Sequence, residues 1–182
     1  MNNLFYQQEL VRSMKLLENE PRVLFIGQNL LNAGCPMYNS LLKVERSRIL
    51  EMPIIEDTQM GMSIGLSLEG CIPVTCYPRI DFMMCAINQL VNHLDKVEGM
   101  SRGEFKQGVI IRTQIGNKKP LNPGLQHCGD YTIGLKKLLK NTKVIKLNKS
   151  EQIYPSYFEA LSRAKNGKST LLIERGSGVW KI

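Results

Sequence analysis

Short runs of apolar residues alternate with longer amphipathic stretches along this chain of 182 residues. Runs of this length, rich in β-branched residues, are typical of buried strands. We therefore predict five strands, at residues 22–27, 71–77, 108–113, 143–147 and 169–174. Between these runs, apolar residues recur at helical spacing. This spacing predicts five helices, at residues 4–18, 57–69, 82–101, 131–140 and 150–165.

Strands that alternate with helices imply βαβ units. We expect an α/β fold, a three-layer sandwich with a mostly parallel central sheet and helices on both faces. The length suits a single domain, which we place over residues 1–182. Ligands of such sheets bind beyond the carboxyl ends of the strands. The loops to search are therefore 27–37, 53–57, 77–82 and 113–130, and the last is long and rich in glycine and proline.

The net charge of +8 is spread along the chain, with its densest cluster at residues 136–146. No nucleic-acid-binding motif accompanies it, so we favour solvated surface, or an acidic partner or ligand, over nucleic acid. No apolar run approaches the roughly 20 residues that span a membrane. The N-terminal segment contains acidic residues and lacks a secretory cleavage site. We expect a cytoplasmic protein.

The cysteines are scattered and odd in number, at positions 35, 71, 76, 85 and 128. They form no C-x-x-C pair, which argues against a disulfide framework or a structural zinc. Gly27 ends a predicted strand, but the segment GQNLLNAG is neither G-x-G-x-x-G nor a P-loop. The motifs H-E-x-x-H and G-x-S-x-G are also absent. His93 lies within a predicted helix, where a structural or surface role is the simpler interpretation.

Two residues in the searched loops carry candidate chemistry. Glu56 follows Pro53 and two isoleucines; an acid here can simply favour a helix start through the helix dipole. Asp57 could serve that purpose equally well. Apolar neighbours would partly desolvate the Glu56 carboxyl and favour a form that donates a hydrogen bond. His127 sits in the long loop, in GLQHCGD, where a histidine can shuttle protons.

These segments, taken in order, resemble a known family. RVLFIGQNL, MPIIEDTQMGMSIGLSLEGCIPVTCYPRIDF, GVIIRT, GLQHCGDYT and STLLIE follow the order of the pyrimidine-binding domain of thiamine-diphosphate enzymes. The nearest relatives resemble the beta subunits of 2-oxo-acid dehydrogenases and the transketolase group. The most specific features are P-I-x-E before a G-x-x-x-G helix, the G-x-x-P-V strand, and D-F-x-x-x-A-x-x-Q. The resemblance covers about residues 5 to 175.

The resemblance implies a role for each matching residue. Glu56 would hydrogen-bond the ring nitrogen of the cofactor's aminopyrimidine and so promote formation of the thiazolium ylide. The Phe82 ring would stack on the aminopyrimidine, and Ile54 would line the same pocket. His127 would face the thiazolium and handle protons of substrate or intermediate. We assign no metal ligand to this chain.

The chain also departs from the family pattern. Beta subunits usually carry an acid after the glycine of the first strand, where this chain has Gln28. Pro78 and Arg79 also depart from the pattern. Arg79 and the Lys118–Lys119 pair could receive a carboxylate or phosphate, or could simply be solvated. These changes affect the expected substrate more than the cofactor.

The diphosphate-binding motif G-D-G…N-N is absent, and we expect neither a diphosphate-binding domain nor a C-terminal transketolase domain. The resemblance therefore implies a separate partner subunit that holds the diphosphate and most of the Mg²⁺ contacts, in an α₂β₂ assembly. Gly61 and Gly65, of the G-x-x-x-G helix, would allow close helix contact there.

The leading interpretation is the pyrimidine-binding subunit of a two-chain thiamine-diphosphate enzyme. It would act on a small-molecule substrate, a 2-oxo acid or a ketose, as a dehydrogenase or decarboxylase (oxidoreductase) or as a transketolase-like transferase. The alternative is a catalytically silent binding or regulatory subunit that keeps the fold. Retention of Glu56, Phe82 and His127 favours the first interpretation.

Overall fold

A six-stranded sheet forms the centre of the computed structural model, which describes residues 3–33, 35, 37–119 and 122–176. The strands are all parallel, in the order β2-β1-β3-β4-β6-β5. They are β1 (Val23–Gln28), β2 (Ile49–Met52), β3 (Ile72–Tyr77), β4 (Ile110–Ile115), β5 (Lys143–Leu147) and β6 (Thr170–Arg175).

The α-helices are α1 (Asn3–Glu18), α2 (Tyr38–Leu41), α3 (Glu56–Leu68), α4 (Ile80–Met83), α5 (Val97–Met100), α6 (Thr132–Leu138) and α7 (Ile153–Lys165). Shorter helical turns are η1 (Arg46–Arg48), η2 (Met84–Ala86), η4 (Leu125–His127) and η5 (Ser150–Gln152), and η3 (Gln89–Leu94) is a π-helix.

The predicted α/β class is confirmed, and each of the five predicted strands is present. The sheet has one further strand, β2, which the sequence pattern did not predict. It contains only four residues, of which Met52 alone is buried. An edge strand this short has too few buried positions to produce a recognisable apolar run.

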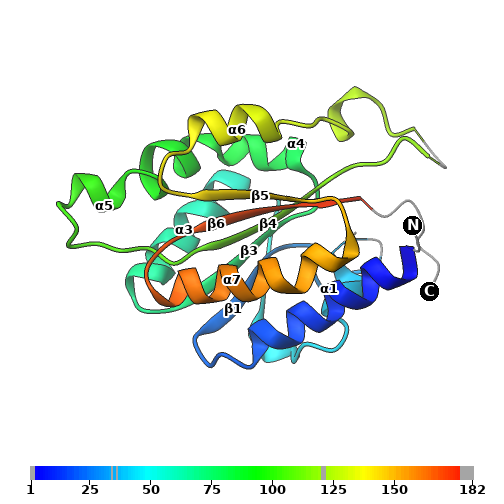
Figure 1. Cartoon of the computed structure of the whole chain (residues 1–182), viewed down its shortest axis with the longest axis horizontal. Helices are drawn as coiled ribbons and strands as arrows, with labels where there is room; N and C mark the ends of the chain where they lie inside the picture. The colour runs from blue at the N-terminus through cyan, green and yellow to red at the C-terminus, as the bar shows by residue number, and fades with distance from the viewer. Residues whose placement is uncertain (1–2, 34, 36, 120–121, 177–182) are drawn as a thin grey trace.

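Helices cover both faces of the sheet (Figure 1). Successive side chains of a strand point to opposite faces, so each central strand supplies two cores. On β4, Ile110 packs in the core beneath α1 and α7, whereas Ile111 packs in the core beneath α3, α4 and α6. A parallel sheet covered in this way places its strand ends and their loops together at one edge.

The prediction of a single long helix at 82–101 is wrong. The structure divides this segment into α4, η2, the π-helix η3 and α5. Near its end the Asp95 amide donates to the Leu90 carbonyl oxygen, and the Asp95 carboxylate accepts hydrogen bonds from the backbone amides of residues 140–142. These hydrogen bonds to a distant segment accompany the wider π turn, and the segment does not form the single regular α-helix that its apolar spacing predicts. No helix in the described ranges is long and apolar enough to cross a membrane.

A buried ion pair joins β4 to β6 beneath α1 and α7. The Arg112 guanidinium donates to both Glu174 carboxylate oxygens, with Nη2 and Oε2 3.1 Å apart. The Tyr157 hydroxyl of α7 also donates to Glu174. Both charged side chains are at most 2% exposed. Burial, followed by the nearby carboxylate, raises the pKa of Tyr157, so this hydroxyl stays a neutral donor.

Gly108, two residues before β4, lies directly against the backbone near the end of α7. A Cβ atom at this position would clash with the Ala164 carbonyl oxygen and lie 2.9 Å from Ala164 Cα. We expect Gly108→Ala to reduce the free energy of unfolding by about 1–3 kcal/mol, because backbone atoms cannot yield as a side chain can. Urea denaturation measures this change. Gly134→Ala is the control: its Cβ meets open space within α6, so stability should rise by about 0.5–1 kcal/mol.

Candidate functional site

Three of the four loops expected to carry the site, 27–37, 53–57 and 77–82, converge on one pocket at the carboxyl edge of the sheet. The pocket has a volume of about 530 Å³. It is lined by Gln28, Asn29, Asn32, Cys35, Ile54, Glu56, Pro78 and Phe82. The chain leaves β1 toward β2 on one side, while β3 lies on the other. The pocket therefore sits at the topological switch point, where open parallel sheets usually bind ligands. Residues 34 and 36, within the first predicted loop, lie outside the described residues.

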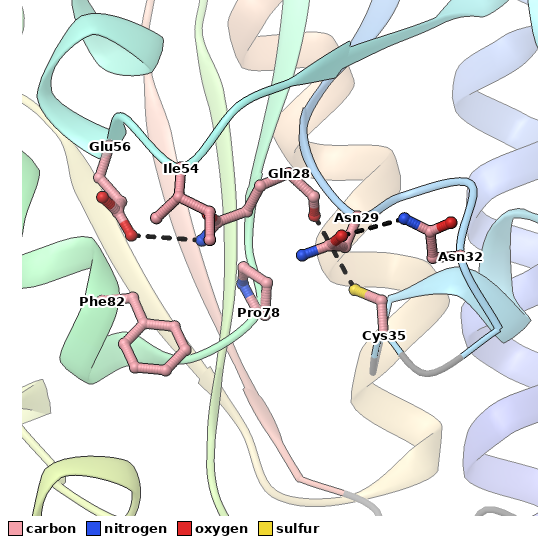
Figure 2. A pocket seen from close by; sticks show the side chains of 8 residues that line it. All are labelled: Gln28, Asn29, Asn32, Cys35, Ile54, Glu56, Pro78 and Phe82. Carbon is pink, nitrogen blue, oxygen red and sulfur yellow. Dashed lines mark hydrogen bonds between the residues drawn. The ribbon is translucent and has the colours of Figure 1, made fainter.

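Glu56 is the first residue of α3, and its side chain faces the pocket (Figure 2). We predicted the helix to begin at Asp57; it begins one residue earlier. Gln28, the last residue of β1, donates from Nε2 to Glu56 Oε1 at 3.3 Å. Glu56 Oε2 has no hydrogen-bond partner within the described part of the chain. One carboxylate oxygen is thus held, and the other is available to a ligand.

The backbone of Glu56 is also fixed. The Tyr77 hydroxyl donates to the Glu56 carbonyl oxygen at 3.2 Å. Burial raises the pKa of Tyr77 well above its usual range, so Tyr77 stays protonated and remains a donor. Deeper in α3, the buried Gln59 amide donates to Thr75 Oγ1 at 2.8 Å and to the Cys76 carbonyl oxygen at 3.1 Å. The start of α3 is therefore tied to β1 and β3, which positions its acid at the pocket.

The wall around Glu56 is apolar. Phe82 projects from α4, and Ile54 and Pro78 line the same part of the pocket (Figure 2). Ile54 is 71% exposed, although isoleucine is usually buried. Phe82 is half-buried. An exposed isoleucine and an aromatic ring beside one carboxyl suit a flat, partly apolar ligand.

The opposite wall is rich in side-chain amides. Asn29 has a positive φ of 56°, and Asn32 donates to its Oδ1 at 3.0 Å. Gln28 is 4% exposed, and its Oε1 has no hydrogen-bond partner in the described part of the chain. Sequence reasoning noted Gln28 only as a departure from the family and did not place Asn29, Asn32 or Cys35 in the pocket. Their position just after a strand-ending glycine was the available signal.

His127 lies next to this pocket and contacts one of its walls. Its imidazole and the Phe82 ring form a T-shaped pair, with centroids 5.4 Å apart and an interplanar angle of 82°. Its Nδ1 atom is buried and has no hydrogen-bond partner among the residues that the structure describes. The structure thus brings together Glu56, Phe82, Ile54 and His127, which the sequence singled out at separate positions. The chemical roles assigned to these four residues stay predictions.

The three basic residues considered for anion binding differ in their surroundings. Arg79 donates from Nη1 to the His127 carbonyl oxygen at 3.2 Å. Lys118 and Lys119 are exposed and do not line the pocket. Among the described residues, no cluster of three histidines, cysteines or acidic residues could hold a metal ion.

The pocket fits one half of the expected cofactor. An aminopyrimidine is a flat ring that needs apolar walls and a hydrogen-bonding partner for its ring nitrogen. Ile54 and Phe82 supply such walls, and the unpartnered Oε2 of Glu56 supplies such a partner. The described residues of this pocket include no cation suited to a diphosphate. Their chemistry therefore suits the aminopyrimidine and leaves the diphosphate without a partner here.

The chain resembles known proteins in sequence and in fold. No protein-family model matches the chain. The chain is 36% identical to a pyruvate dehydrogenase E1 component subunit beta from Cyanidium caldarium over 74 residues, 41% of this chain and 23% of that protein. It is 28% identical to the corresponding subunit from Chaetosphaeridium globosum over 119 residues, 61% of this chain and 34% of that protein. The chain thus spans about a third or less of these relatives.

A solved structure of a split-gene transketolase, an inactive β4 tetramer, has the same fold. The TM-score is 0.70 at 20% sequence identity, and the match covers 98% of this chain and 52% of that one. The structural match shows that the chain has the transketolase-like α/β fold. In sequence, the chain is similar to beta subunits of pyruvate dehydrogenase, and the two comparisons together support a transketolase-like pyrimidine-binding domain.

Proposed function

We propose that this chain is the pyrimidine-binding subunit of a two-chain thiamine-diphosphate enzyme. The observation that carries the proposal is the placement of Glu56 at the start of α3. Its Oε2 has no hydrogen-bond partner among the described residues, and it lies in a pocket beside an apolar wall that includes Phe82. When bound, thiamine diphosphate supplies a thiazolium carbon that becomes a nucleophile and stores the electrons released from a substrate.

The residues of this chain would prepare that chemistry. Gln28 holds one oxygen of Glu56, so the other can hydrogen-bond the ring nitrogen and carry a proton at that atom. Phe82 and Ile54 would orient the ring and exclude water from it. The free Nδ1 of His127 would accept or return a proton at the substrate side. The roles of Glu56 and His127 each use an atom without a hydrogen-bond partner among the described residues. The roles of Phe82 and Ile54 use side chains that line the pocket.

A second chain would complete the site. The sequence relatives are named as subunits, and the split-gene transketolase structure is an inactive tetramer of beta chains. We propose a partner that binds the diphosphate and Mg²⁺, with α₂β₂ as the expected assembly. The substrate would be a 2-oxo acid or a ketose, handled by dehydrogenase, decarboxylase or transketolase-like chemistry.

Co-purification with the product of the adjacent reading frame tests this proposal. Calorimetry then measures thiamine diphosphate binding, in the presence of Mg²⁺, to the complex and to each chain alone. We expect the complex to bind one cofactor for each copy of this chain, and this chain alone to bind far more weakly. Capture of a partner without cofactor binding would instead support the catalytically silent subunit.

Replacing Phe82 should weaken cofactor binding in that complex. Phe82→Ala removes the aromatic wall, and aromatic pairing contributes about 0.5–1.5 kcal/mol beyond simple burial. With the lost apolar contact included, we expect the dissociation constant to rise at least about tenfold by calorimetry. Phe158→Ala is the matched control, because Phe158 is exposed on α7 at the opposite face of the sheet. Equal effects of the two variants would contradict the assignment.

A further inference from the structure

The loop that carries His127 is attached to the start of α4 by two charged side chains. Arg79 is the residue just before α4, and Asp81 is the second residue of the helix. Ile80, between them, is fully buried. The core therefore fixes the backbone from which both charged side chains reach the loop.

The two side chains bind the loop at His127 and at the residues that follow it. Arg79 Nη1 donates to the His127 carbonyl oxygen at 3.2 Å. The Asp81 carboxylate accepts from the Gly129 amide at 3.2 and 3.3 Å, and from the Tyr131 hydroxyl at 3.1 Å. This bond to Asp81 raises the pKa of Tyr131. The attachment holds backbone atoms and leaves the His127 ring nitrogens free for other partners.

Two glycines make this attachment possible. A Cβ on Gly116 would clash with both the His127 carbonyl oxygen and the Arg79 guanidinium. A Cβ on Gly129 would lie 2.6 Å from Asp81 Oδ1. A side chain at Gly116 would therefore meet the loop backbone, and one at Gly129 would displace the side chains of Asp81 and Tyr131.

We propose that Arg79 and Asp81 are positioning residues that hold the loop of residues 122–131 against α4 and so set the His127 imidazole against the Phe82 ring. The next residue after Asp81 is Phe82, so the same short turn fixes the aromatic wall and the histidine relative to each other. This assigns Arg79 to the loop rather than to an anionic ligand. The significance for catalysis rests on the proposed function, but the positioning itself does not.

Histidine-selective NMR of the isolated chain tests the proposal without cofactor or partner. The chain contains only His93 and His127. His93 is exposed on η3 and serves as the internal reference. The Phe82 ring current should displace the His127 ring-proton signals from ordinary values, and Phe82→Leu should remove that displacement. Failure of cofactor activation would leave this measurement unaffected.

We expect Arg79→Ala and Asp81→Ala each to remove most of the displacement that Phe82→Leu removes. Arg79→Lys should restore part of it, because lysine can still donate to the carbonyl. Tyr131→Phe, which deletes one hydroxyl and keeps the ring, is a milder variant in case the alanine variants do not fold; it should give a smaller change in the same direction. Unchanged His93 signals and thermal unfolding confirm that each fold is intact.

Arg46→Ala is the matched control, because it removes an equal charge from η1, at the opposite end of the strands. It should leave the His127 signals in place. The proposal is overturned if Arg79→Ala and Asp81→Ala also leave them in place. It is likewise overturned by a second pair of results: inorganic phosphate shifts the His127 signals of the wild type but not those of Arg79→Ala, and Arg79→Ala without phosphate leaves the signals in place.

Discussion

Glu56→Gln is expected to slow deuterium exchange at the thiazolium carbon of bound thiamine diphosphate by about 10²–10⁴-fold. Glutamine keeps the size of the side chain and can still meet Gln28, but it cannot carry the titratable proton that the ring nitrogen requires. Exchange is followed by NMR after acid quench of the complex formed with its partner. The readout needs no substrate, so an unknown substrate does not limit it.

Asp57→Asn is the control for this result. Asp57 is the next residue of the same helical turn, and its carboxylate is exposed and accepts from Gln89 at 3.2 Å. The two variants remove the same charge from the start of α3, so any general effect on the helix dipole is shared. We expect the Asp57→Asn complex to exchange within a few-fold of wild type. Equal loss in both variants would show that Glu56 acts only through the helix.

The second large effect concerns stability. Removing one partner of the buried Arg112–Glu174 pair should lower the free energy of unfolding by about 3–5 kcal/mol, because the remaining charge is buried without a partner. Glu174→Gln also weakens the contact with Tyr157. Urea denaturation measures the change.

Replacing the whole cluster should cost much less. The combination of Arg112→Met, Glu174→Leu and Tyr157→Phe leaves no unpaired polar group, and such replacements are often neutral or stabilising. The exposed pair of Lys143 and Glu159 provides the surface control. Lys143→Ala should change stability by at most about 1 kcal/mol. If the triple variant were less stable than Glu174→Gln, desolvation would not be the controlling factor.

The sequence predicted the fold closely where the physical signal was local. The five predicted strands are apolar runs that the sheet buries, and their order with the helices indicated a parallel sheet. The edge strand β2 escaped because only one of its residues is buried. The segment 82–101 was mispredicted because Asp95 bonds to amides some 45 residues away, a tertiary contact that helical periodicity does not record.

For the candidate site, too, the residues with a local sequence signal could be predicted and the others could not. Glu56, Ile54 and Phe82 could be identified because they occupy motif positions beside strand ends. The contact between His127 and Phe82 depends on how a long loop folds back, which no local pattern encodes. Gln28 stood out only as a departure, yet it is the residue that holds the Glu56 carboxylate.

The two interpretations of Glu56 are therefore compatible. As the first residue of α3, it meets the preference of helix starts for an acid. As a lining residue of the pocket, it presents a free carboxylate oxygen to a ligand. The helix start gives the carboxyl a fixed backbone, and Gln28 gives it a fixed orientation.

NMR of the ring nitrogen itself tests the central claim most directly. Thiamine diphosphate labelled with a magnetic nitrogen isotope at the pyrimidine ring nitrogen is bound to the complex of this chain and its partner. We predict a resonance displaced from that of free cofactor, as a hydrogen bond from Glu56 requires, and loss of most of this displacement in Glu56→Gln. A bound cofactor whose ring-nitrogen resonance is identical in wild type and Glu56→Gln would contradict the account.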